Sequence, residues 1–134
     1  MADKVMSMKN LTFTLQAKME GLGKEHSGVL NGHDKKSIGM VLDAAFDIAK
    51  KELHPIFEDM DRNPPIFSKG NVTVHPDVRK ILNLLGKDGW ISATFPEKWG
   101  GENMPSSLLH CINFIFAAAN YSASVYSGLT IGAA

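Results

Sequence analysis

The sequence is poor in the features that support metal, disulfide or polyanion chemistry. It has a single cysteine, Cys111, which excludes an internal disulfide and a zinc site built from thiolates. Its 14 basic and 14 acidic residues cancel, so no overall field attracts nucleic acid or an anionic membrane. No apolar run reaches the ~18 residues of a membrane span, and the polar start lacks the order of a secretory signal. These absences predict a soluble, cytoplasmic protein with no nucleic-acid partner and no membrane span.

Motifs for catalysis or cofactor binding are absent as well. The five histidines form no His-Glu-x-x-His pair, and no glycine-rich phosphate loop is present. The charged residues of 58–62 resemble an acid/base group, but at the end of an amphipathic helix they are better interpreted as a solvated face. His110 and Cys111 are adjacent and therefore point to different sides of a helix, which disfavours a nucleophile and base pair. No catalytic, cofactor-binding or metal-binding residue is assigned.

The hydrophobic pattern predicts an all-α fold. We expect an up-and-down bundle of about four to six helices, with a short irregular or hairpin excursion near 66–74. The length of 134 residues suits one domain with a substantial core. Residues 1–36 are expected to form an N-terminal extension and loop, with a polar connector over 21–36. Residues 37–134 are expected to form the helical domain.

The strongest helical pattern starts at Ser37, which we expect to cap the helix, and stops before Asn63-Pro64-Pro65. Pro55 interrupts this stretch, so a kink or break is expected near Glu52. Apolar residues recur there at three- and four-residue steps. They are Ile38, Val41, Leu42, Ala45, Ile48, Ala49, Leu53, Ile56, Phe57 and Met60.

Four further elements complete the prediction. A short amphipathic piece contains Leu11 to Met19, and His75-Pro76 opens a helix that ends near Gly86. Two β-prone pieces flank Lys69-Gly70-Asn71, which favours a small hairpin. A helix beginning at 106 or 107 is apolar nearly all round and is expected at the centre of the bundle.

The loop FPEKWGGENMP, residues 95–105, precedes that central helix. We expect Phe95 and Trp99 to anchor it in the core, and Gly100-Gly101 to reverse the chain. The last segment of the sequence, ANYSASVYSGLTIGAA, residues 119–134, carries no charge and is rich in small residues. Apolar surface of this kind is normally covered, so we expect more of the same chain, a partner, or both to pack there.

Several short motifs, in this order and spacing, resemble the N-terminal helical domain of acyl-CoA dehydrogenases. The motifs are Glu52-Leu53-x-Pro55, Met60-Asp61-Arg62, Gly89-Trp90-Ile91, Phe95-Pro96-Glu97-x-Trp99-Gly100-Gly101-x-x-Met104-Pro105, Ala118-Ala119-Asn120 and Tyr126-x-Gly128-Leu129-Thr130. The likeness runs from about Phe13 to Ala134. Leu11-Thr12-Phe13 and the Tyr-x-Gly-Leu-Thr motif resemble a long bacterial subgroup that includes 3-methylmercaptopropionyl-CoA dehydrogenase.

This resemblance implies a flavoprotein in which a β-domain and a second helical domain follow. The implied reaction forms a 2-enoyl-CoA from an acyl-CoA thioester, with FAD as the hydride acceptor. The catalytic glutamate and most flavin contacts come from the later domains in that family. The 134 residues alone are therefore expected to be inactive and not to bind FAD. The implied partners are the acyl-CoA substrate, an electron-transfer acceptor and further copies in a homo-oligomer.

The resemblance also implies a substrate-binding wall along the helix that matches 119–132. The residues implied to line the acyl pocket are Ser124, Val125, Tyr126, Gly128 and Leu129. Small residues there leave room for a ligand, and they equally permit close packing of two helices. Some relatives carry a charged residue near Gly128 for dicarboxylic substrates, and none stands there in this sequence. A non-dicarboxylic acyl group is favoured.

One alternative function belongs to a different class. The same helical domain could be a free-standing binding or interaction module without catalysis. Such a module would need its apolar C-terminal surface closed by a partner or by self-association.

Overall fold

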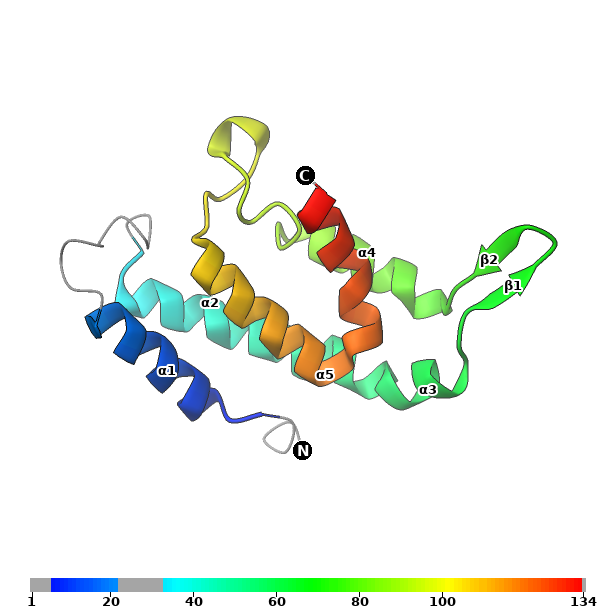
Figure 1. The fold of residues 1–134 in the computed structure, drawn as a ribbon, viewed down its shortest axis with the longest axis horizontal. Coiled ribbons are helices and arrows are strands. Elements are labelled where there is room, and N and C mark those ends of the chain that lie inside the picture. The colour runs from blue at the N-terminus through cyan, green and yellow to red at the C-terminus, as the bar shows by residue number, and fades with distance from the viewer. Residues whose placement is uncertain (1–5, 22–32, 134) are drawn as a thin grey trace.

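The computed structural model describes residues 6–21 and 33–133 of the chain, and most of these residues are helical (Figure 1). The elements are α1 (Met8–Gly21), α2 (Lys35–Ile48), α3 (Phe57–Arg62), β1 (Ile66–Ser68), β2 (Asn71–Thr73), α4 (Pro76–Lys87) and α5 (Ser106–Ala133). The helical class is thus confirmed. Most of the predicted connector over 21–36, the side chain of Met19, and Ala134 lie outside the described residues.

The core forms where α5 packs against α2, the segment Ala49–Leu53 and α4. Its most deeply buried apolar side chains come from all of these elements and are Leu42, Leu53, Leu85, Leu108, Ile112 and Ile115. Each fully buried aliphatic side chain contributes roughly 1.5–3 kcal/mol to folding, so this contact dominates the stability. The first half of α5 occupies the central position that its apolar pattern predicts. It is not enclosed on every side, because Phe114 remains 56% exposed.

Helix α2 begins earlier than predicted. Its N-cap is Asp34 rather than Ser37, because the Asp34 carboxylate accepts a hydrogen bond of 2.7 Å from the Ser37 backbone N–H. The Ser37 hydroxyl donates back to the Asp34 carbonyl at 2.9 Å. Hydrogen bonding to the carboxylate, first from the Ser37 backbone N–H and then from the Ser37 side chain, holds the pKa of Asp34 below its usual value. The assignment of Ser37 as the cap was wrong by one helical turn.

The helical path from α2 to α3 is broken where Pro55 predicts a break. Residues Ala49–Leu53 form a π-helical turn and His54–Ile56 a 3₁₀ turn, after which α3 resumes the α-helix. Proline has no N–H to donate and its ring crowds the preceding turn, so a regular α-helix cannot pass through this position. The kink predicted near Glu52 is confirmed.

The predicted hairpin near 66–74 is also confirmed. Strands β1 and β2 pair antiparallel with Phe67 opposite Val72. The two-residue turn uses Lys69 at φ 50° and Gly70 at φ 80°, the left-handed pair that tight hairpins require. The six strand residues are all exposed, and the hairpin stands away from the helices (Figure 1).

The glycine loop reverses the chain as expected, but its anchor differs from the prediction. Gly100 adopts a left-handed φ of 78° and closes a 3₁₀ turn. Trp99 is 70% exposed, with Lys98 Nζ 4.6 Å from its ring centroid, so its assignment as a core anchor was wrong. Met104 is the buried residue, and its N–H donates to the Ala93 carbonyl at 2.8 Å.

Helix α5 bends sharply within its length (Figure 1). Asn120 has φ −162° and ψ 93°, which separates a first half over 106–119 from a second half over 121–133. Together with the break at Pro55 and the added hairpin, this bend makes the domain broadly helical rather than a regular up-and-down bundle.

Candidate functional site

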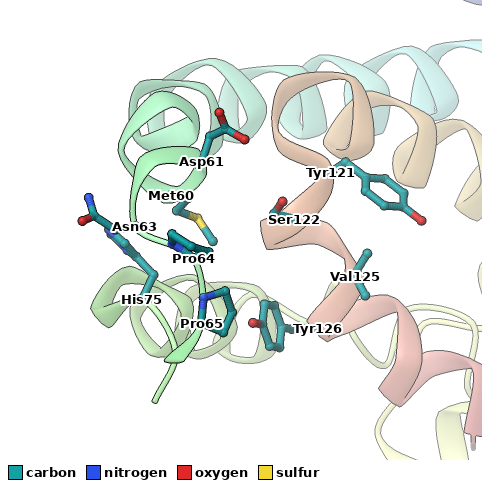
Figure 2. Close-up of a pocket in the computed structure, with 10 residues that line it drawn as sticks. All are labelled: Met60, Asp61, Asn63, Pro64, Pro65, His75, Tyr121, Ser122, Val125 and Tyr126. Atoms are coloured by element: carbon teal, nitrogen blue, oxygen red, sulfur yellow. The ribbon is translucent and has the colours of Figure 1, made fainter. Parts of the chain in front are cut away.

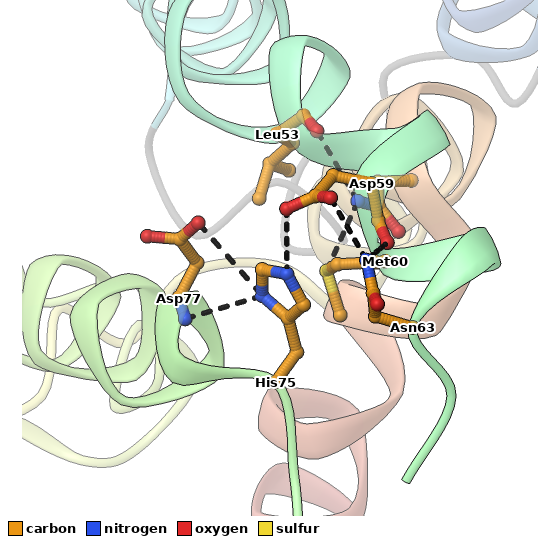
Figure 3. Close-up of polar contacts among 7 residues, drawn as sticks. Leu53, Asp59, Met60, Asn63, His75 and Asp77 are labelled. Carbon is orange, nitrogen blue, oxygen red and sulfur yellow. Dashed lines mark hydrogen bonds and ion pairs between the residues drawn. The ribbon is translucent and has the colours of Figure 1, made fainter.

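The bend in α5 is held by the buried side chain of Asn120, which is 1% exposed. Its Oδ1 accepts a hydrogen bond of 3.0 Å from the Ala123 N–H and so caps the second half of the helix. Its Nδ2 donates to the Leu53 carbonyl at 3.2 Å and reaches Met60 Sδ at 3.4 Å. Figure 3 shows the Leu53 and Met60 side of this contact. One amide therefore ties α5 to the broken segment before α3.

The Leu53 carbonyl changes its helical partner where the α-helix is broken. In a regular α-helix it would accept from the N–H of Phe57, four residues later. In the 3₁₀ turn that N–H donates to the His54 carbonyl instead. Within the 3₁₀ turn the Leu53 carbonyl accepts from the Ile56 N–H, three residues later, and Asn120 adds a second donor from α5.

A hollow of about 290 Å³ straddles the bend in α5. Its lining residues come from both halves of that helix and are Asn113, Ala117, Tyr121, Ser124, Val125, Gly128 and Leu129. None of them is charged. We call this set the α5 hollow.

The sequence-predicted site residues divide between two surfaces. Ser124, Val125, Gly128 and Leu129 line the α5 hollow together. Tyr126 does not, since it lines a different cleft on the α3 side, to which Val125 also contributes. A Cβ added at Gly128 would have no atom within 4 Å, so this glycine leaves open space rather than a close helix contact.

The second surface, which we call the α3 cleft, has a volume of about 350 Å³ (Figure 2). Its lining residues come from α3, the 63–65 turn, the N-cap of α4 and the second half of α5. They are Met60, Asp61, Asn63, Pro64, Pro65, His75, Tyr121, Ser122, Val125 and Tyr126. Figure 2 shows Tyr126 facing Pro65 across the cleft. Sequence reasoning did not predict this cleft, because its two sides are distant in the sequence.

His75 is the buried ionisable residue beside this cleft, with 6% of its side chain exposed. Its Nε2 lies 2.9 Å from Asp59 Oδ2, and its Nδ1 accepts from the Asp77 backbone N–H at 3.3 Å (Figure 3). This pattern fits a neutral imidazole with its proton on Nε2. Asn63 Nδ2 donates to the other Asp59 oxygen at 2.9 Å.

Both ring nitrogens of His75 are therefore used within the fold. We assign it the role of N-cap for α4 and of a connection between α4 and α3, rather than that of a general base. Sequence reasoning noted only that His75-Pro76 opens a helix. The missed signal was a capping side chain placed directly before a proline at the first helical position.

The remaining candidates of the sequence analysis stay apart. Glu58 and Arg62 form an ion pair in which both side chains are 73% exposed, as expected of a solvated face. His110 is exposed and Cys111 is half-buried on the first half of α5. Within residues 6–21 and 33–133, no group of three or more His, Cys, Asp and Glu side chains is placed to hold a metal ion.

Helix α5 is the element that tests the prediction of no membrane span. From Ser106 to Gly132 it is long and apolar enough to cross a membrane, judged by length and composition only. Of its most apolar window, 44% is buried inside the protein, and the core helix of a soluble protein passes the same criteria. This is weak evidence for a membrane, so the absence of a span stays a prediction.

Comparison with protein-family models and with curated proteins found no match for this chain. The assignment of a function therefore depends on the sequence motifs and on the geometry described above.

Proposed function

We propose that this chain is the N-terminal helical domain of an FAD-dependent acyl-CoA dehydrogenase and that the α5 hollow forms one wall of its acyl pocket. The observation that carries the proposal is the clustering of Ser124, Val125, Gly128 and Leu129 around one uncharged hollow. The resemblance implies these residues for acyl contact. Helical spacing already brings these four residues together, and the open space at Gly128 adds support, because close helix packing would have filled it.

The size and chemistry of the hollow suit part of an acyl chain. Small-molecule sites are usually about 300–1,000 Å³, so a volume of 290 Å³ matches one side of a site that other domains complete. Asn113, Tyr121 and Ser124 are its members with polar groups, and it contains no carboxylate or basic group that would pair with a charged acyl terminus. A non-dicarboxylic acyl group is therefore the proposed substrate class.

The α5 hollow does not fit FAD itself. A flavin diphosphate needs basic side chains or several converging N–H donors, and the lining residues supply neither. When bound in the complete enzyme, FAD accepts the β-hydrogen of the substrate as hydride. We propose that its contacts, and the carboxylate that removes the α-proton, come from the other domains.

The proposal extends to the setting of the enzyme. We propose a cytoplasmic homo-oligomer that passes electrons to a separate acceptor, with this domain arranged as the helical-bundle part of each subunit. The exposed apolar side chains along α5, Phe114, Tyr121 and Leu129, would then be covered by later domains.

The test reduces the volume of the α5 hollow at Gly128, where an added side chain has open space. In the protein as its gene encodes it, Gly128→Leu should lower kcat/KM for long acyl-CoA substrates about tenfold relative to short ones. One missing or extra methylene in a hydrophobic pocket changes kcat/KM by about this factor. Gly132→Leu is the matched control: it lies in the same helix half, its Cβ position is also open, and it is not among the lining residues. The measurement is acyl-CoA-dependent reduction of an artificial electron acceptor.

Two results would contradict the proposal in different ways. A purified protein without flavin absorbance and without acyl-CoA oxidation would refute the dehydrogenase assignment. Equal chain-length profiles for Gly128→Leu and Gly132→Leu would refute the assignment of the hollow as the acyl wall.

A second candidate function is a helical interaction module without catalysis. It is favoured by the same exposed residues, since Tyr121 is 68% and Leu129 69% exposed on an uncharged helix. This candidate predicts a stable protein without flavin that self-associates or captures a partner through α5. Sedimentation of the wild type and of Leu129→Lys distinguishes it, because a charge at the contact should dissociate the complex.

A further inference from the structure

The α5 hollow and the bend at Asn120 are one structural unit. Asn113 and Ala117 line the hollow from the first half of α5, and Ser124 and Gly128 line it from the second half. The backbone leaves the helical conformation between them, at Asn120. The angle between the two halves therefore determines the width of the hollow.

Two hydrogen bonds from one side chain, Asn120, span the bend. Oδ1 of Asn120 accepts from the Ala123 N–H in the second half of α5. Nδ2 of Asn120 donates to the Leu53 carbonyl in the core. Leu53 is fully buried, so the core end of this connection cannot shift easily. A rotation of the second half would break one of these two bonds in a place that water does not reach.

We propose that Asn120 is a positioning residue for acyl-chain specificity: by joining the second half of α5 to the Leu53 carbonyl, it sets the width of the α5 hollow. The specificity role depends on the proposed function for its substrate. The structural half of the inference, that Asn120 sets the angle between the two halves of α5, does not. Asn120 touches no substrate in this scheme. It acts through the direction in which Ser124, Val125 and Gly128 are presented.

The decisive variant removes the connection but keeps the helix cap. Asn120→Ser retains an oxygen that can accept from the Ala123 N–H, but its side chain is too short to reach the Leu53 carbonyl. Asn120→Asp keeps the size and the accepting oxygen and replaces the donating Nδ2 with a carboxylate oxygen that the Leu53 carbonyl repels. It carries the test should Asn120→Ser fail to fold. Met60→Leu is the control, because it removes the contact to Sδ at similar volume and leaves the bond to Leu53 intact.

Two readouts are measured in the protein as its gene encodes it. The first is the distance between spin labels at exposed positions on either side of the bend, His110→Cys and Gly132→Cys, in a Cys111→Ala background. We expect one narrow distribution in the wild type and in Met60→Leu, and a broadened or displaced one in Asn120→Ser. The second is the ratio of kcat/KM for long and short acyl-CoA substrates, which we expect to change about tenfold in Asn120→Ser only.

A merely structural role for Asn120 would lower stability and leave this ratio unchanged. An unchanged ratio in a folded, active variant overturns the specificity role, and an unchanged label distance overturns the claim that Asn120 sets the angle. If the wild type oxidises no acyl-CoA at all, the proposed function fails and the specificity role fails with it. The label distances then still decide the structural half, so the two failures are distinguishable.

Discussion

Replacing Gly101 with alanine should destabilise the protein more than replacing any other described glycine. A Cβ at this position would lie 2.1 Å from the Phe95 carbonyl oxygen and 2.5 Å from the Phe95 carbonyl carbon. Both are backbone atoms, so no rotamer change can relieve the overlap. The loop 95–104 would have to open.

The cost follows from the contacts that opening removes. The Asn103 N–H donates to the Phe95 carbonyl at 2.9 Å, and the Gly101 N–H donates to the Pro96 carbonyl at 3.3 Å. Each such bond is worth about 0.5–1.5 kcal/mol, which gives about 2 kcal/mol for the pair. Partial exposure of Met104, which is 9% exposed in the fold, adds about 1 kcal/mol. We therefore expect a loss of about 3 kcal/mol in the free energy of unfolding.

Two other glycines serve as controls with different predicted results. Gly100→Ala meets no atom within 4 Å but must adopt φ 78°, so it should cost only about 1 kcal/mol. Gly39→Ala lies inside α2 with open space around it and should stabilise by about 0.5–1 kcal/mol. Urea unfolding measures all three, and a slope of about 2 kcal/mol per molar converts 3 kcal/mol into a midpoint shift of about 1.5 M. A Gly101→Ala midpoint equal to that of Gly100→Ala would refute the steric argument.

The remaining predictions concern two N-caps, Asp34 of α2 and His75 of α4. Hydrogen bonds from Ser37 lower the pKa of Asp34 in the folded protein below its unfolded value of 3.8. The stability that this cap contributes should therefore be constant above pH 3.8 and disappear as the pH falls through the lower folded pKa. Thermal melts of the wild type and Asp34→Ala should therefore converge in acid, while Asp34→Asn, an uncharged cap, should show no such loss. His75→Ala should cost about 2–3 kcal/mol, since it removes the cap of α4 and the bond to Asp59 together. His75→Asn should recover about 1 kcal/mol of this through the cap alone, and equal urea midpoints for the two variants would contradict the capping role.

Local patterns in the sequence were sufficient to predict most of the secondary structure. Pro55 predicted the break, because a missing N–H acts at its own position whatever surrounds it. Lys69-Gly70-Asn71 predicted the hairpin for a similar reason, since a two-residue turn depends on the backbone freedom of its own residues. The helix starting near 106 followed from composition alone.

The errors occurred where a distant partner or a neighbouring competitor decides the outcome. Ser37 and Asp34 are both good caps, and a pattern of apolar residues does not tell which of two positions one turn apart begins the helix. Trp99 was assigned to the core because large aromatic residues are usually buried. The reversal at Gly100 instead directs it to solvent, where Lys98 covers one face of its ring.

The candidate site was predictable only in part. Small, uncharged residues on the last helix indicate either a pocket or close packing, and the resemblance was needed to favour a pocket at Ser124, Val125, Gly128 and Leu129. The bend that separates these residues from Asn113 was not predicted. The Asn120 side chain at the bend bonds to the Leu53 carbonyl, 67 residues earlier in the chain.

The same chain of reasoning explains why a polar residue occupies the middle of the most apolar helix. An apolar residue at 120 would leave the Ala123 N–H without its cap and would remove the second donor of the Leu53 carbonyl. Asparagine is suited to solve both problems, because it carries an acceptor for the cap and a donor for the carbonyl on one short side chain. The break before α3 and the bend in α5 are therefore joined by one side chain. A substitution that restores a regular helix at either position should disturb the other, and with it the hollow that the bend creates.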